Sequence, residues 1–183
     1  MCVVSLIVVS LGTDHHPFER LVAWSETWTQ QFADWELVVQ HGRTRAPSVG
    51  TGFDFCGREQ LDELFERAQV VACHGGPGTI TQARRFGHTP IVVPRDPNRG
   101  EHVDNHQQLF ARRLGASGAV SLAETHDAFL AAAVGASFLP RQRVDDDVPP
   151  GVFAVGQVAE QLAAGRRGIV KQRSAREGHR PPR

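Results

Sequence analysis

Residues 69–79 read QVVACHGGPGT, and this stretch decides the fold. The apolar run Gln69–Cys73 predicts a buried strand that ends at His74. A glycine-rich loop follows and leads into the amphipathic segment Thr79–Phe86, which predicts a helix with Gly87 in the C-cap position. A strand, a tight glycine loop and a helix in succession are the unit from which parallel α/β sheets are built.

The same alternation extends outward in both directions. Further strands are predicted over Cys2–Leu11, Glu36–Gln40, Gly50–Phe55, Pro90–Val93 and Ala119–Leu122. Further helices are predicted over Pro17–Phe32, Arg58–Ala68, Asp104–Leu114, Ala123–Val134 and Val152–Ala164. We therefore expect an α/β fold, Rossmann-like, in three layers with helices on both faces of a parallel sheet. The tryptophans are interpreted as core residues: Trp24, Trp28 and Trp35.

Length and composition exclude several classes of protein. The chain has 183 residues, 40% hydrophobic and 22% charged, which is ordinary for one globular domain and excludes a coiled coil, a collagen-like chain and wholesale disorder. The longest apolar stretch, Met1–Val9, is far shorter than the ~20 residues of a membrane span, and no basic residue precedes it as in a secretion signal. The three cysteines form no C-x-x-C pair, which favours a reducing, cytoplasmic location over a disulfide framework.

Charge divides the chain into a body and a tail. Residues 165–183 carry a net charge of +6 and residues 1–164 carry −6, so the body is no general binder of nucleic acid or other polyanions. We expect a Rossmann-like domain over residues 1–164, a polar hinge at residues 141–150 inside it, and a basic, disordered tail over residues 165–183. That tail would either contact an anionic membrane peripherally or be solvated without a role.

The glycine loop after Cys73 is the strongest candidate site. Three glycines in four positions leave backbone N–H groups open to a ligand, and the start of the following helix favours an anion such as a diphosphate. The alternative is a tight turn, in which Thr79 and Gln82 form a capping box. The loop is neither a Walker loop nor a G-x-G-x-x-G fingerprint.

Two more loops are expected at the same carboxyl edge of the sheet. In the loop after Val93, His102 and His106 are four residues apart, but the string HVDNH lacks the glutamate of the H-E-x-x-H zinc motif. Hydrogen bonding to a sugar or ribose is the favoured interpretation there, with a metal site or simple helix capping by Asp104 and Gln107 as alternatives. The loop after Leu11 offers Gly12 and Thr13, with adjacent histidines that would help to neutralise phosphate.

Taken in order, three segments resemble a known family: Gly12-Thr13 with Pro17-Phe18, the HGGPGT loop at residues 74–79, and Pro94-Arg95 with GEHVDNHQ at residues 100–107. They look like the C-terminal, donor-binding domain of family 28 glycosyltransferases. The likeness is greatest to the single-domain subunits of bacterial exopolysaccharide synthesis and dolichol-linked GlcNAc transfer. It covers residues 1–114 and extends to residue 164.

The resemblance implies one half of a GT-B fold that binds a UDP-sugar. It places the glycine loop and Gly12-Thr13 on the diphosphate, and residues 104–107 on sugar and phosphate. Where the family usually has a ribose-binding glutamate, this chain has Gln82, which hydrogen-bonds without charge assistance. The implied UDP-sugar contacts are Gly12, Thr13, His74, Gly75, Gly76, Pro77, Gly78, Thr79, Gln82, Arg95, Glu101, His102, Asp104, His106 and Gln107.

The resemblance also implies a function. We expect a cytoplasmic, donor-binding hexosyltransferase subunit that uses UDP-GlcNAc or another UDP-hexose in polysaccharide or glycolipid synthesis. No metal or other cofactor is expected, because amides and a helix dipole would stabilise the leaving UDP. In two-domain relatives the base and the lipid site belong to the other domain, which this chain is too short to contain, so a separate membrane-anchored subunit would supply them. His15 is a weak candidate for the base. A non-catalytic nucleotide-sugar-binding module is the alternative, and a fragment of a related epimerase is disfavoured.

Overall fold

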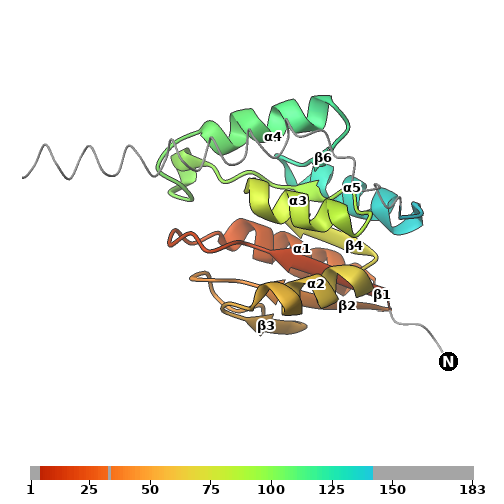
Figure 1. Ribbon diagram of the computed structural model, residues 1–183. Coiled ribbons are helices and arrows are strands. Elements are labelled where there is room, and N and C mark those ends of the chain that lie inside the picture. The colour runs from red at the N-terminus through yellow and green to blue at the C-terminus, as the bar shows by residue number, and fades with distance from the viewer. Residues whose placement is uncertain (1–4, 33, 142–183) are drawn as a thin grey trace, which may run out of the picture. The chain divides into compact units, whose positions relative to one another are not determined.

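The computed structural model describes residues 5–32 and 34–141 (Figure 1). All of them belong to the first of two compact units, Met1–Asp145, and the second unit is Asp146–Arg183. The helix predicted over Val152–Ala164, the hinge beyond Arg141 and the basic tail lie outside the described residues, as does the predicted boundary at residue 164.

The described residues form a six-stranded parallel sheet in the order β3-β2-β1-β4-β5-β6. The central strand β1 pairs with β2 on one side, Ile7 opposite Leu37, and with β4 on the other, Ile7 opposite Val70. The strand order reverses between β1 and β4, which is where sheets of this type bind their ligands. The strands are β1 (Ser5–Ser10), β2 (Trp35–Gln40), β3 (Thr51–Phe53), β4 (Val70–Cys73), β5 (Ile91–Val92) and β6 (Ser121–Leu122).

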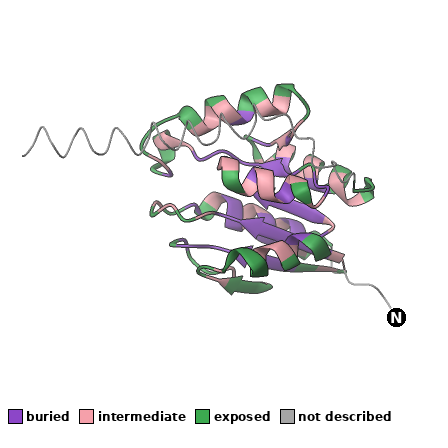
Figure 2. Ribbon diagram, viewed as in Figure 1, coloured by how far each residue is buried: buried purple, intermediate pink, exposed green. Residues whose placement is uncertain are grey.

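Helices cover both faces of this sheet (Figure 2). Ile7 and Val9 of β1 pack with α1 and α5, whereas Leu6 and Val8 point to the opposite face and pack with α2 and α3. Alternate side chains of a strand point to opposite faces, so a continuous apolar run serves two cores at once. The helices are α1 (Glu19–Gln31), α2 (Arg58–Arg67), α3 (Pro77–Arg85), α4 (His106–Ala116) and α5 (His126–Phe138). The predicted three-layer α/β class is confirmed.

Trp28 packs in the core as predicted, and Trp24 and Trp35 are partly buried against it. Trp28 is 1% exposed and meets the ring of Trp35 edge-on, with 4.7 Å between the ring centroids. Trp24 packs against the same core from α1 and lies 6.0 Å from the ring of Phe129 on α5. These contacts attach α1 to both the sheet and its neighbouring helix.

Several predicted boundaries are wrong. Helix α5 starts three residues later than predicted, because the Thr125 hydroxyl accepts the N–H of Ala128 and sets the N-cap there. Strand β3 covers only Thr51–Phe53 of the predicted 50–55, and a short 3₁₀ helix at Pro97–Arg99 was not predicted. Among the described residues, no helix combines the length and apolar character needed to cross a membrane.

Candidate functional site

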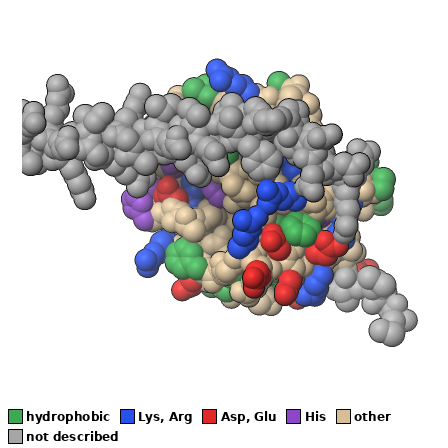
Figure 3. Space-filling view, viewed as in Figure 1, with side chains coloured by type: hydrophobic (Ala, Val, Ile, Leu, Met, Phe, Trp, Pro, Cys, Tyr) green, Lys and Arg blue, Asp and Glu red, His purple; other side chains and the backbone are tan. Residues whose placement is uncertain are grey.

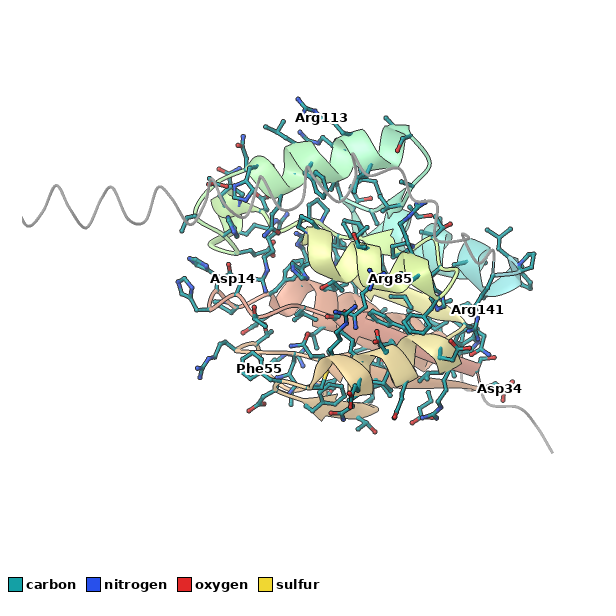
Figure 4. All side chains as sticks on the ribbon, viewed as in Figure 1. Asp14, Asp34, Phe55, Arg85, Arg113 and Arg141 are labelled. Atoms are coloured by element: carbon teal, nitrogen blue, oxygen red, sulfur yellow. The ribbon has the colours of Figure 1, made fainter. Side chains whose placement is uncertain are left out.

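The loops that follow β1, β4 and β5 meet at the carboxyl edge of the sheet. Asp14 and Phe55 lie at this end and Asp34 lies at the opposite one (Figure 4). The imidazole of His74 separates the first two loops: a Cβ on Gly12 would lie 2.3 Å from its Cε1, and one on Gly76 would lie 2.2 Å from its Nε2. Gly12 also has φ +73°, which favours glycine. The absence of side chains at Gly12 and Gly76 therefore makes room for the histidine as well as for any ligand.

Helix α3 begins at this edge without a side-chain cap. Its N-cap is Gly76 and Pro77 is its first helical residue, so Thr79 is already inside the helix. The predicted capping box of Thr79 and Gln82 is wrong, because a proline at the first helical position starts the helix two residues earlier than the amphipathic pattern indicates. Ile80 N–H donates to Gly76 O, but the N–H groups of Gly78 and Thr79 have no partner among the described residues. The open amides and the positive end of the helix dipole suit an anion.

The Gln82 side chain points towards α2. Its Nε2 donates to Asp62 Oδ1 at 2.7 Å and, more weakly, to the carbonyl of Arg58 at 3.4 Å. Both acceptors belong to α2, so Gln82 holds the two helices together. Its Oε1 has no partner among the residues described.

His74 is an uncharged imidazole at neutral pH. Burial, and then the nearby charge of Arg95, lower its pKa to about 4. The ring Nδ1 lies 3.4 Å from the carbonyl of Ser10. His74 can therefore offer a ligand a hydrogen bond but not a positive charge.

Gln40, at the end of β2, organises the first loop and was missed in the sequence. Its Nε2 donates to the carbonyls of Gly12 at 3.0 Å and Asp54 at 2.9 Å, and its Oε1 accepts the N–H of Gly12 at 3.1 Å and the hydroxyl of Ser10 at 2.9 Å. The Gly12 amide is thus occupied by protein. The one signal in the sequence is a glutamine that directly follows an apolar strand.

Arg95 is 1% exposed and holds two loops together. Its guanidinium donates to the carbonyls of Leu11, His16 and Glu101 at 2.8–3.0 Å and lies 4.7 Å from the centre of the Phe18 ring. Those N–H groups, on both terminal nitrogens, are engaged by backbone, whereas the buried Nε–H of Arg95 has no partner among the described residues. Burial lowers its pKa, although Asp14 and Glu101 oppose that shift.

Glu101 is likewise engaged inside the protein. Both of its carboxylate oxygens accept from Arg20 of α1, at 3.0 and 2.7 Å, and Oε2 also accepts the N–H of Asp96. The side chains of Arg20 and Glu101 are 11% and 6% exposed, which makes this a buried, bidentate ion pair. Glu101 therefore ties α1 to the loop after β5.

The histidines and aspartates of the first and third loops lie next to each other. His102 Nε2 is 3.5 Å from Asp14 Oδ2, and His102 Nδ1 is 3.6 Å from Asp104 Oδ1, which also contacts His106 Nδ1. The predicted capping of α4 by Asp104 is wrong, since Asn105 is the N-cap; Asp104 instead accepts the His106 N–H from one position earlier. Burial would raise the pKa of Asp14, but hydrogen bonds from His16 and the charges of Arg95 and His16 lower it.

Two predicted residues have contrasting surroundings. Gln107 is the second residue of α4, not the third as predicted, and its buried Oε1 has no hydrogen-bond partner among the described residues. It lies beside the glycine loop, because a Cβ on Gly75 would come within 3.3 Å of Gln107 Cβ. His15, in contrast, is 79% exposed and reaches only Asp14, at 3.7 Å, and the ring of His16.

A cavity of about 280 Å³ lies away from these loops. Its lining includes Val70, His88, Thr89 and Ser121, at the amino ends of β4, β5 and β6, together with Leu139 after α5. Ligands of parallel sheets bind at the opposite, carboxyl edge. The structure thus brings Gly12, His74–Gly76, Asp14, His102–His106 and Gln107 together there, while Gln82, Arg95 and Glu101 bond to protein; ligand contacts of all these residues stay predictions.

Comparisons with known proteins agree with this architecture. A UDP-N-acetylglucosamine--N-acetylmuramyl-(pentapeptide) pyrophosphoryl-undecaprenol N-acetylglucosamine transferase of Bdellovibrio bacteriovorus is 32% identical over 82 residues, 45% of this chain and 21% of that protein. The UDP-N-acetylglucosamine transferase subunit ALG13 of Yarrowia lipolytica is 31% identical over 124 residues, 60% of each chain. This chain therefore spans less than two thirds of the length of both relatives.

A solved structure shows the same fold. The glycosyltransferase of kitacinnamycin superposes with a TM-score of 0.59 at 21% identity, over 85% of this chain and 39% of that one. The likeness confirms the expectation of a Rossmann-like domain that forms one half of a GT-B fold. The family model described as the glycosyltransferase family 28 C-terminal domain matches residues 7–146, which include the three loops and nearly all of the sheet, and the chain belongs to this family.

Proposed function

We propose that this chain is the donor-binding, catalytic subunit of a hexosyltransferase that uses UDP-GlcNAc or another UDP-hexose in polysaccharide or glycolipid synthesis. The observation that carries the proposal is the uncapped start of α3, where the N–H groups of Gly78 and Thr79 have no partner among the described residues. Family membership and the similarity to a UDP-N-acetylglucosamine transferase subunit support the choice of nucleotide sugar.

The chemistry of the transfer explains why such a helix start is useful. Negative charge grows on the diphosphate as UDP leaves, and amides fixed in advance stabilise that charge without reorganising. A helix N-terminus contributes roughly 0.3–1 kcal/mol to an anion, and up to about 2 kcal/mol where it is partly buried. The buried positive charge of Arg95 adds to this potential, while its N–H groups keep the loops in place.

Gln107 supplies the polar contact expected for the sugar. Its buried Oε1 lacks a donor among the described residues and lies beside the glycine loop. An unpaired buried acceptor costs about 1–3 kcal/mol, which a sugar hydroxyl that donates to it would recover. This contact would favour a hexose over the free nucleotide.

A second chain would complete the enzyme in this proposal. We place the acceptor site and the base on a membrane-associated subunit, as the resemblance to family 28 domains implies, and keep the exposed His15 as a weak candidate for a base in this chain. The Yarrowia lipolytica relative is itself named as a subunit, which supports such a division. The complex would work on the cytoplasmic side of the membrane, where the basic residues 165–183 would meet anionic lipid.

UDP binding by the purified chain tests the donor site. We expect millimolar UDP to raise the melting temperature, as a ligand bound to the folded state must. Gly76→Val should abolish the shift, because its side chain would displace His74 and cover the amides. Gly135→Ala, at a helical position with open space around it, is the matched control and should keep the shift.

Gln107→Leu provides a second test of the donor site if Gly76→Val does not fold. This variant should retain the UDP shift but lose the extra affinity for UDP-hexose, which isothermal calorimetry measures. Absence of any UDP shift in the wild-type chain, with and without its partner, would refute the donor site. Sugar transfer that requires both chains would support the catalytic subunit, whereas binding without turnover would make the chain a non-catalytic nucleotide-sugar-binding module.

A further inference from the structure

We propose that His102, Asp104 and His106 bind a divalent transition-metal ion of the Zn²⁺ class. The three residues offer two imidazole nitrogens and one carboxylate oxygen, all within 4.8 Å of one another. Imidazole and carboxylate donors together suit Zn²⁺ and its close analogues better than Mg²⁺ or Ca²⁺, which prefer oxygen alone. No glutamate general base is required, since the proposal concerns binding and not hydrolysis.

The donor atoms already face one another. His102 Nδ1 and Asp104 Oδ1 are 3.6 Å apart, and Asp104 Oδ1 contacts His106 Nδ1 directly. Ligand atoms about 2.0–2.2 Å from a tetrahedral ion lie a little over 3 Å from each other, so His106 must only rotate away from the carboxylate. The His106 side chain is 57% exposed, which leaves it free to do so.

The far side of the His102 ring provides the independent observation. Its Nε2 lies 3.5 Å from Asp14 Oδ2, so a proton on Nε2 would face this carboxylate, and Nδ1 would exchange its long hydrogen bond from the Asp104 N–H, 3.3 Å, for the ion. Metal-binding histidines almost always donate their second nitrogen to a carboxylate or carbonyl, which fixes the tautomer and the orientation of the ring. Asp14 comes from the loop after β1, 88 positions before His102 in the sequence, so the fold builds this arrangement. The His102 side chain is 10% exposed and is thereby held in place.

Charge balance agrees with an ion at this position. Asp14 and Asp104 place two carboxylates at this edge, and histidine side chains gather at this end of the molecule (Figure 3). A divalent ion offsets both carboxylates and leaves at least one coordination position open to water or to a phosphate oxygen. The ion would then connect the loops after β1 and β5.

Metal binding by the full chain tests the inference. After treatment with EDTA and dialysis, calorimetric titration with ZnCl₂ should give one site per chain, and Co²⁺ should give the visible absorption band of a tetrahedral complex. His102→Ala, Asp104→Ala and His106→Ala should each weaken Zn²⁺ binding at least tenfold. Asp14→Asn should weaken it by roughly ten- to hundredfold as a positioning residue.

Control variants distinguish this site from the other histidines of the chain. His126→Ala, on α5, should leave Zn²⁺ affinity unchanged. If His15→Ala removes binding as strongly as His106→Ala, the ion belongs to the neighbouring group of Asp14, His15 and His16, and the proposal is wrong. Zn²⁺ binding that is absent in the wild type, or that survives all three ligand substitutions, also overturns it. The titration contains no nucleotide, and UDP binding is measured in EDTA, so each proposal fails or stands by itself.

Discussion

A single hydrogen bond to the Asp62 carboxylate sets the direction in which the Gln82 side chain points. Asp62 accepts from the Gln82 amide nitrogen at 2.7 Å, which turns the amide oxygen away from α2. By the resemblance to family 28 domains, this position usually carries a glutamate that binds ribose. The pair of Gln82 and Asp62 thus contains one carboxylate, and that carboxylate belongs to Asp62 of α2 and not to residue 82 of α3.

Restoring the glutamate should therefore destabilise the protein. Gln82→Glu brings two carboxylates within hydrogen-bonding distance, and for a partly exposed pair we expect a loss of about 0.5–1 kcal/mol in the free energy of unfolding at neutral pH. Urea unfolding measures this loss.

The double variant Gln82→Glu with Asp62→Asn is the control, because it exchanges the two groups and restores a donor between them. It should recover the stability of the wild type. Equal stability of all three proteins would contradict the electrostatic explanation.

Residue-level predictions from sequence succeeded where the chemistry is local. The glycines around His74 can be recognised because a loop between strand and helix has few other reasons for three of them. Gln40 and Arg95 could not be assigned in the same way. Their partners, such as Gly12 for Gln40 and Leu11 for Arg95, are 28 and 84 positions away, so only the folded chain brings the groups together.

At the scale of the elements, one ion pair holds α1 against the loop after β5. Arg20 and Glu101 bond through both carboxylate oxygens and are nearly buried, and Arg20 also donates to the carbonyl of Pro94. Removal of one member leaves the other charged group in a poorly solvated place.

Glu101→Gln should cost roughly 3 kcal/mol of unfolding free energy, because the Arg20 charge loses its partner. Chemical denaturation monitored by tryptophan fluorescence measures it. Glu124→Gln removes one member of the exposed pair with Arg112 and is the matched control, which should keep the midpoint of the wild type. If both variants lose the same amount of unfolding free energy, burial of the ion pair is not the cause of the loss.

Element boundaries were predicted less well than element types, for a reason visible at α3 and α5. Apolar periodicity extends over several turns and identifies a helix, but a helix start depends on a single proline or hydroxyl. Pro77 moved the start of α3 earlier than the periodic pattern, and Thr125 moved that of α5 later. The alternation of strands and helices predicts the class of fold, a parallel sheet covered by helices. It does not predict strand order or register, because both depend on contacts between segments.

For the whole molecule, buried titratable groups make stability depend on pH. His74 has its pKa lowered from 6.5 to about 4 by burial and by Arg95, and burial also lowers the pKa of His88 and His102. A lowered pKa in the folded state means that protons bind the unfolded chain first as the pH falls. The stability contributed by His74 is complete above pH 6.5 and is lost between pH 6.5 and 4, by about 3 kcal/mol.

Unfolding free energies measured over this pH range should decrease towards acid. His74→Asn should remove most of that decrease, whatever its stability at neutral pH, and His15→Asn, at an exposed position, should leave it unchanged. A further decrease should follow between pH 4.5 and 2, where Glu26 takes up a proton, because hydrogen bonds from Arg45 hold its pKa at about 2. A profile that is flat from pH 7 to 4 would contradict the buried, neutral state of His74.

The reactivity of Cys73, the last residue of β4, reports how often this domain opens. Cys73 is completely buried between the sheet and α3, and burial raises the pKa of its thiol to about 12. Alkylating reagents attack the thiolate, so Cys73 reacts only in those rare moments when its strand separates from its neighbours, whereas the half-buried Cys56 reacts much sooner. The rate at which iodoacetamide alkylates Cys73 relative to Cys56, followed by mass spectrometry, therefore measures how often the native sheet opens locally, with no denaturant added.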